Sequence, residues 1–166
     1  MKSIFILLAF FPCIVFCQKK SRSGFESIGI TMLLRDGAPS FGAAAAVGFG
    51  NEKVTIGLGG ELYSFKSTRS PYIPFFAHLK AYANQNKIQP YATIAVGHGI
   101  YNDGLKQGGL YFAASAGLHL RNFEKPKKPG IYFQVGLKQL SFRTNYLFSH
   151  VVERAGYLSI DLGFRF

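Results

Sequence analysis

The final residues of the chain alternate between apolar side chains and small or polar ones. From residue 155 onward the sequence reads A-G-Y-L-S-I-D-L-G-F-R-F and closes on a phenylalanine. The apolar positions are Leu158, Ile160, Leu162, Phe164 and Phe166. A period of two puts alternate side chains on opposite faces of a β-strand, so this segment predicts a strand with one wholly apolar face.

The same alternation recurs along the chain. It predicts eight strands, at residues 24–34, 40–50, 53–65, 72–83, 89–101, 109–121, 130–142 and 154–166. Turn-forming residues separate these segments, as in Arg35-Asp36-Gly37 and Asn102-Asp103. No segment is long and periodic enough to predict a helix. An even number of strands of this length is typical of chains that cross an outer membrane as a β-barrel.

The two faces of these strands separate a membrane barrel from a water-soluble one. One face is almost wholly apolar, and the other carries glycine, alanine, tyrosine and a few charged residues. Strands that face water would carry long Lys and Glu side chains instead of many Gly and Ala. Eight of the nine tyrosines fall on the second face, as expected for an interior in which their hydroxyls find partners. Since an eight-stranded barrel is only wide enough for side chains to fill, the second face is predicted to line the lumen.

The N-terminal segment has the pattern of an export signal. Lys2 precedes an uncharged, mostly apolar stretch at residues 4–17, and charge returns at Lys19. The stretch contains Pro12 and is shorter than the roughly 20 residues of a spanning helix, so residues 1–17 are predicted to be a cleaved signal peptide. The alternative is a lipoprotein acylated at Cys17.

Cleavage after Cys17 would leave residues 18–166 as a single barrel domain. Both cysteines of the chain, Cys13 and Cys17, would be removed, so the domain would have no disulfide. One lysine and no acid would be lost, and the net charge of +11 would fall to +10. A basic surface suits anionic partners.

The closing strand resembles that of Gram-negative outer-membrane β-barrels, whose terminal Phe and alternate apolar residues are read by the barrel assembly machinery. Over its whole mature length the chain resembles the small eight-stranded barrels of the OmpA-transmembrane and OmpX type. This resemblance implies an all-β, eight-stranded antiparallel up-and-down transmembrane barrel. We expect a monomer in the outer membrane, with lipid and lipopolysaccharide as its partners and no nucleic acid. Leu158, Ile160, Leu162, Phe164 and Phe166 would form the assembly signal.

An even strand count returns both termini to the periplasm. The connections near residues 35–39, 66–71, 102–108 and 143–153 would then be extracellular, and the last is the longest. Basic side chains on these connections are candidates to bind lipopolysaccharide phosphates. They are Arg35, Lys66, Arg69, Lys106, Arg143 and Arg154. Loops exposed to water carry charged residues in general, and this explains the six basic residues equally well.

Charged residues on the inward face are expected to form a paired network that closes the lumen. They are Glu61, His78, Lys80, Arg121, Lys138, Asp161 and Arg165. Buried charges need partners, and neighbouring strands bring Glu61 near Lys80 and Lys138 near Asp161. Because bases outnumber acids, the others must rely on tyrosine hydroxyls, carbonyls or water. This imbalance predicts a hydrated gap at the periplasmic end.

Catalytic and metal-binding motifs such as G-x-S-x-G, H-E-x-x-H and the P-loop are absent from the sequence, and the four histidines are scattered. We therefore expect no metal and no cofactor. Ser149, His150 and Glu153 are the residue types of a nucleophile, a base and an orienting group. Neighbours in an extended strand point to opposite faces, however, which separates Ser149 from His150.

Three functions follow from the sequence. The leading one is a non-enzymatic integral outer-membrane protein with a structural or surface-binding role. The second is a narrow pore for small solutes, for which Gly42 and Gly48 leave space in the lumen. The third is a lipid A-modifying barrel enzyme.

Overall fold

The computed structural model describes residues 23–36, 38–51, 53–65, 70–83, 86–103, 106–121, 129–146 and 149–166. Nine strands lie within these ranges. They are β1 (Ser23–Arg35), β2 (Ala38–Gly50), β3 (Val54–Ser64), β4 (Ile73–Tyr82), β5 (Ile88–Ile100), β6 (Asn102–Asp103), β7 (Lys106–Leu120), β8 (Gly130–Tyr146) and β9 (Ser149–Arg165). The predicted signal peptide at residues 1–17 lies outside the described residues.

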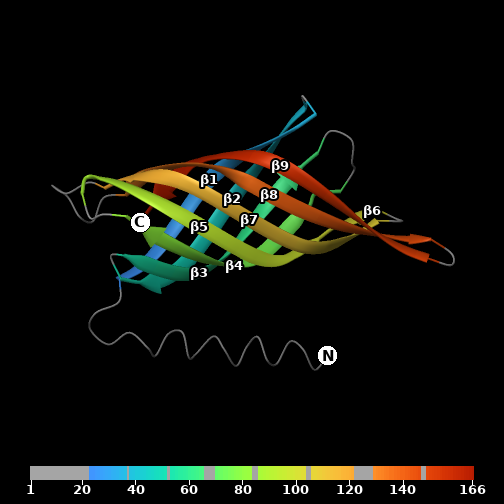
Figure 1. Cartoon of the computed structure of the whole chain (residues 1–166), viewed down its shortest axis with the longest axis horizontal. Helices are drawn as coiled ribbons and strands as arrows, with labels where there is room; N and C mark the ends of the chain where they lie inside the picture. Colours follow the sequence, from blue (N-terminus) through green and yellow to red (C-terminus); the bar gives the residue numbers. More distant parts are fainter. Residues whose placement is uncertain are drawn as a thin grey trace, which may run out of the picture.

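The eight long strands form one closed antiparallel barrel (Figure 1). Each long strand pairs with its neighbour in the chain, β1 pairs with β9, and β5 pairs with β7. The two-residue strand β6 pairs only with the start of β7. The predicted eight-stranded up-and-down fold is therefore confirmed. Within the described residues, no helix is long and apolar enough to cross a membrane.

The barrel has two ends, which we call the terminal rim and the loop rim. At the terminal rim β1 begins and β9 ends, and backbone hydrogen bonds in both directions join Glu26 to Phe166. At the loop rim Arg35 pairs with Ala38 across a turn in which Asp36 has a φ of 51°. This left-handed conformation is one that Asp tolerates, and Asp-Gly is the preferred sequence for a two-residue hairpin turn.

The predicted strands agree with the observed ones except at two of the predicted loops. Residues 102–108, predicted as a loop, contain the short strand β6 and the first residues of β7. The larger difference is at residues 143–153. The sequence predicts a long loop there, but β8 and β9 continue as a paired hairpin from Arg143 opposite Val152 to Tyr146 opposite Ser149. Figure 1 shows this orange and red hairpin reaching beyond the barrel at the loop rim. Val151, Val152 and Glu153 are consecutive and all exposed. Because consecutive side chains are exposed at residues 151–154, the sequence carries no alternation there that would reveal a strand.

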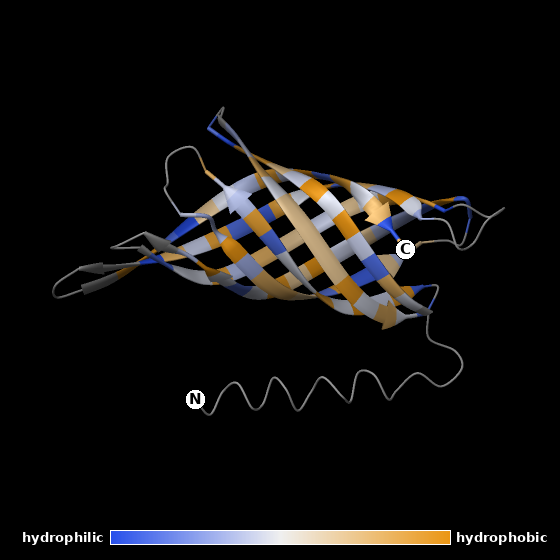
Figure 2. Cartoon of the chain, turned by 180° about the vertical axis from the view of Figure 1, so that it is seen from behind, coloured by the Kyte–Doolittle hydropathy of each residue, from blue (hydrophilic) through white to orange (hydrophobic). Residues whose placement is uncertain are grey.

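The outer face of the barrel is apolar, and the inner face is buried. Side chains of Ile, Leu, Val and Phe lie exposed along every long strand, as in Ile30, Phe75 and Leu137. Figure 2 shows the matching pattern in the ribbon, where hydrophobic positions alternate with more hydrophilic ones. Seven tyrosines are buried inside: Tyr63, Tyr72, Tyr82, Tyr91, Tyr101, Tyr111 and Tyr132. Tyr157 is partly buried against the same interior. The predicted separation of tyrosine from the apolar outer face is therefore confirmed.

Candidate functional site: the barrel lumen

The lumen has one wall of small residues, and aromatic rings fill the space that this wall leaves. Gly48 of β2 pairs with Gly57 of β3. A Cβ atom on Gly48 would lie 2.7 Å from Cε1 of Phe25, and one on Gly57 would lie 2.8 Å from Cε1 of His78. These two glycines are therefore required by the close approach of the two rings, whose centroids are 5.8 Å apart. The small residues of β2 and β3 give packing space and do not leave an open channel.

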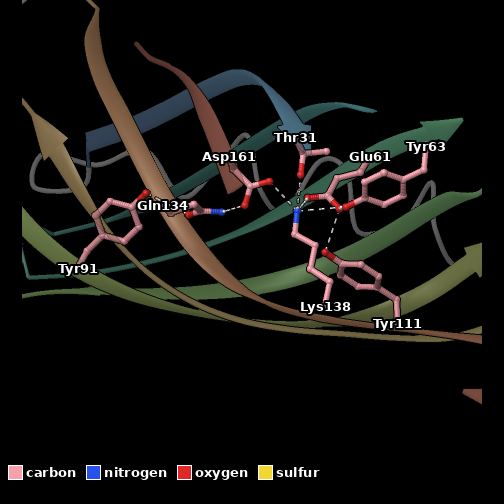
Figure 3. A network of polar contacts seen from close by, with 8 residues as sticks. All are labelled: Thr31, Glu61, Tyr63, Tyr91, Tyr111, Gln134, Lys138 and Asp161. Atoms are coloured by element: carbon pink, nitrogen blue, oxygen red, sulfur yellow. Dashed lines mark hydrogen bonds and ion pairs between the residues drawn. The ribbon is translucent and has the colours of Figure 1, made fainter. Parts of the chain in front are cut away.

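Lys138 of β8 is the centre of a buried ionic network (Figure 3). Its Nζ donates to Oε1 of Glu61 at 2.9 Å and to Oδ1 of Asp161 at 2.8 Å. Oγ1 of Thr31 and the hydroxyl oxygen of Tyr63 lie at 3.1 Å from the same nitrogen. The side chains of Lys138, Glu61 and Asp161 are 2%, 6% and 3% exposed. One ammonium thus bonds to two carboxylates inside the barrel, and the three buried groups together carry one net negative charge.

Hydrogen bonds extend this network in both directions. The hydroxyls of Tyr63 and Tyr111 donate to Oε2 of Glu61, the latter at 3.0 Å. On the other side, Nε2 of Gln134 donates to Oδ2 of Asp161 at 2.8 Å. Oε1 of Gln134 accepts from the hydroxyl of Tyr91 at 3.0 Å. Figure 3 shows these side chains meeting from different strands, so the network braces the barrel across its lumen.

The predicted pairing of Glu61 with Lys80 is wrong. Neighbouring strands suggested Lys80, but Glu61 pairs with Lys138, which is 77 positions away in the chain. Lys80 lies opposite Thr55 in the β3–β4 register, six positions before Glu61, so the stagger between adjacent strands separates the two charges. The other expected pair, Lys138 with Asp161, is present on adjacent strands β8 and β9.

Lys80 and Arg165 face aromatic rings. Nζ of Lys80 lies 4.4 Å from the ring centroid of Tyr91 and 5.4 Å from that of Tyr132. Cζ of Arg165 lies 4.4 Å from the ring centroid of Phe25 and 5.1 Å from that of Tyr82. Cation–π attraction of this kind is worth ~2 kcal/mol or more where water is excluded. Both cations lie in the half of the lumen nearer the terminal rim.

Two predicted lumen residues remain, His78 and Arg121. His78 is buried between the rings of Phe25 and Phe76. Arg121 follows the end of β7 at the terminal rim and is half-buried. His119 is buried and was not predicted as part of the network; its Nδ1 lies 3.1 Å from Oε1 of Gln89.

Aromatic and apolar side chains close the lumen at the loop rim. The rings of Tyr72, Tyr101 and Phe142 contact one another with centroids 5.2 to 6.2 Å apart. Leu33 and Leu140 pack into the same cluster, and their side chains have no exposed surface. We call these five residues the loop-rim plug. They fill the barrel between the Lys138 network and the loops.

Sequence reasoning missed Thr31 as a network member and Leu33 and Leu140 as inward residues. Thr31 lies two residues after Gly29 in β1, so alternation places both residues on the inward face and could have identified Thr31. Leu33 lies in the run Met32-Leu33-Leu34, where three successive apolar residues leave no contrast between the faces. Such a run gives no sign that the middle residue points inward.

The predicted surface residues are exposed where the structure describes them. Arg143 and Arg154 are exposed on the β8–β9 hairpin. Arg35 is bonded through Nε to Oδ2 of Asp36 at 3.1 Å, and its guanidinium lies 5.6 Å from the ring centroid of Tyr157. Lys66 and Arg69, and the side chain of Lys106, lie outside the described residues. The side chains of Ser149 and His150 also lie outside the described part of the structure.

The predicted assembly residues form one outward row on β9. Leu158, Leu162, Phe164 and Phe166 are exposed, and Ile160 is partly exposed on the same face.

A cavity of about 60 Å³ lies inside the barrel between the Lys138 network and Lys80. Its lining includes Lys80, His78, Thr93, Tyr132 and Asp161. A space of this size holds a few water molecules, since one water needs roughly 10–15 Å³. Among the described residues, no three His, Cys, Asp or Glu side chains gather as metal ligands would.

Neither a protein-family model nor a curated protein matches the sequence. The structure is similar to the crystal structure of Neisserial surface protein A, with a TM-score of 0.54 and 14% identity over 87% of this chain and 98% of that one. The chain has the fold of the small eight-stranded outer-membrane β-barrels.

Two further solved structures cover a similar span. The solid-state NMR structure of outer membrane protein AlkL in DMPC bilayers matches with a TM-score of 0.47 and 9% identity, over 89% of this chain and 90% of that one. The crystal structure of Ail, the attachment invasion locus protein of Yersinia pestis, in complex with the heparin analogue sucrose octasulfate matches with a TM-score of 0.40 and 17% identity. That match covers 89% of this chain and all of the other.

Proposed function

We propose that the protein is an integral outer-membrane barrel of a Gram-negative bacterium, with a structural or surface-binding role and no catalytic one. One observation carries the proposal: a closed barrel has an apolar outer face and a lumen that side chains fill. An exposed apolar surface of this extent exceeds the ~600 Å² patch of a water-soluble monomer. A lipid bilayer covers such a surface, and a closed barrel leaves no strand edge unpaired within it.

The placement of the charged groups supports a membrane environment. Lys138, Glu61 and Asp161 all point into the lumen, where their side chains are buried. A lysine facing lipid near the midplane would cost ~2–4 kcal/mol, whereas inside the barrel it has two carboxylate partners.

The loop-rim plug argues against the pore function. A pore needs a continuous polar path, but Tyr72, Leu33 and Leu140 have no exposed surface. The cavity that remains is bounded by the Lys138 network and does not reach the plug. The space beside Gly42 and Gly48, which favoured a pore, is filled by the rings of Tyr63 and Phe25.

The β8–β9 hairpin supports a surface-binding role. Arg143 is opposite Val152, and Arg154 lies two residues farther along β9, so the two arginines share one face as diagonal neighbours. Guanidinium groups in this arrangement suit the phosphates of lipopolysaccharide, because Arg binds phosphate with paired donors. The hairpin reaches beyond the barrel at the loop rim, which is where such headgroups would lie.

The proposal is tested first by folding and fractionation. We expect the protein to enter the outer-membrane fraction and to migrate differently on a gel before and after boiling, as a folded barrel does. Recovery of a folded, monodisperse protein from the periplasm without detergent would contradict the membrane assignment. An ion conductance typical of an open porin in planar bilayers would favour the pore instead.

The surface role needs its own experiment. Arg143→Gln with Arg154→Gln should weaken binding to vesicles that contain lipopolysaccharide, and the loss should shrink at high salt. Lys87→Gln is the matched control, because Lys87 is an exposed base in a turn at the terminal rim. Equal binding by both variants would contradict a role for the hairpin. A change in lipid A composition on deletion of the gene would favour the enzyme instead.

A further inference from the structure

Lys80 is a buried cation without a counter-ion. Lys80 is 9% exposed, and within the described part of the chain its ammonium contacts two ring faces and no carboxylate. An ammonium group has three N–H donors, and a ring face satisfies a donor only weakly. Burying a charge is costly unless it is paired and hydrogen-bonded, so something further is expected beside this nitrogen.

Two unpartnered hydroxyls flank Lys80 on the neighbouring strands. The register places Thr55 of β3 and Thr93 of β5 directly opposite Lys80, one on each side. Oγ1 of Thr55 and Oγ1 of Thr93 are both buried, and neither has a hydrogen-bond partner among the residues that the structure describes. A buried hydroxyl without a partner is uncommon and calls for a ligand or a water. Three donor-bearing side chains therefore lie side by side across three strands.

Among the described side chains of the long strands, the inward-facing charges leave one excess positive charge. Within the long strands, the inward acids are Glu61 and Asp161, and the inward bases are Lys138, Lys80 and Arg165. With histidine counted as neutral, three bases face two acids. Lys138 contacts both carboxylates, so the excess charge lies with Lys80 and Arg165.

The cavity beside Lys80 has room for a ligand. Lys80 and Thr93 both line it, and its volume is about 60 Å³. Lys80 lies two residues before the terminal-rim end of β4, whereas the loop-rim plug closes the opposite end. A small solute would therefore enter from the terminal rim, past Arg165.

We propose that the cavity holds one small monovalent inorganic anion, of halide size, bound by the Lys80 ammonium and the Thr93 hydroxyl. A single negative charge matches the single excess positive charge of the described inward side chains on the long strands. The volume fits such an ion with a few waters. Arg165, farther out, adds a positive field along the way in.

Bromide is the probe for this site, because its anomalous scattering identifies it in a crystal. We expect crystals of the detergent-solubilised barrel, grown with bromide in place of chloride, to show an anomalous peak beside Nζ of Lys80. Lys80→Met should abolish the peak. Methionine keeps the apolar stem, and replacing a buried charge that lacks a carboxylate partner by an apolar group is tolerated by folded proteins.

Thermal unfolding in solution gives an independent measurement. With bromide at about ten times its dissociation constant, the unfolding constant of the wild-type protein should fall about elevenfold relative to gluconate at equal ionic strength. Lys80→Met should show no such difference. Thr93→Val keeps the side-chain shape and removes one donor, so it should bind bromide more weakly. Lys87→Met, which removes an exposed lysine near the same rim, should behave as wild type.

Three results would overturn the proposal. The first is density beside Lys80 without an anomalous signal, which would identify water alone. The second is a bromide peak that persists in Lys80→Met. The third is an equal gain in stability from bromide in the wild type and in Lys80→Met, which would show a general salt effect.

Discussion

Replacing Lys138 by methionine should destabilise the barrel strongly. The change removes two charge-assisted hydrogen bonds, at 2.9 and 2.8 Å, and leaves the carboxylates of Glu61 and Asp161 buried without a cation. A hydrogen bond to a charged group contributes ~1.5–3 kcal/mol. Breaking a buried ion pair by removing one partner costs ~3–5 kcal/mol. We therefore expect the free energy of unfolding to fall by about 3–5 kcal/mol.

A triple variant distinguishes two causes of this destabilisation: the loss of the Lys138 hydrogen bonds and the burial of two carboxylates without a cation. Lys138→Met with Glu61→Gln and Asp161→Asn removes all three charges and keeps the side-chain shapes. Because uncharged amides are cheaper to bury, this triple variant should recover most of the lost stability. The Tyr111 hydroxyl and Gln134 can still hydrogen-bond to the new amide oxygens.

The assay is equilibrium unfolding by denaturant in lipid vesicles or detergent. The chain contains no tryptophan, so tyrosine fluorescence or circular dichroism must report the transition. Lys87→Met is the control and should shift the free energy of unfolding by no more than about 0.5 kcal/mol. The reasoning is refuted if Lys138→Met shifts it as little as the control does, or if the triple variant is as unstable as the single one.

Three further predictions follow from the same structure. The protein should refold from denaturant only when detergent or lipid is present, and circular dichroism should show no native strand signal in buffer alone. Deleting Phe166 should strongly reduce the yield of inserted barrel in cells but lower the melting temperature of the inserted barrel only slightly, because this exposed ring contributes little to a large apolar face. Equal yields of the deletion variant and the wild type would count against an assembly signal. The wild-type barrel should not conduct ions in planar bilayers, whereas the double variant Tyr72→Ala with Phe142→Ala should produce measurable current. No current from this variant would mean that the Lys138 network alone closes the lumen.

The sequence predicts the faces of the strands well because the signal is local. In a strand, the direction of each side chain alternates with its neighbours, so Tyr72 and Tyr101 could be placed inside although both lie at strand ends. The β8–β9 hairpin escaped prediction for the same reason. Where Val151 and Val152 are both exposed, burial no longer distinguishes the two faces and the period disappears.

Partners across the lumen are not predictable from local pattern. The Lys138–Glu61 contact depends on the stagger of strands around the barrel and on the small residues of β2, which leave space between the facing walls. Alternation along neighbouring strands indicates which charged residues share a face, and on this basis Glu61 was predicted to pair with Lys80. It does not give the height of each charge along the barrel axis, which decides the pairing.

The Lys138 network and the loop-rim plug together place any surface activity outside the barrel. The network joins residues of six strands, from Thr31 of β1 to Asp161 of β9, across the lumen. The network thus links strands on different sides of the lumen, and the buried side chains of the plug pack at its loop-rim end. Lys138 lies on β8 five residues before Arg143, so the strand that holds the network also carries the arginine hairpin beyond the rim. Under the proposed function, a rigid interior would fix the position of Arg143 and Arg154 against the lipopolysaccharide layer.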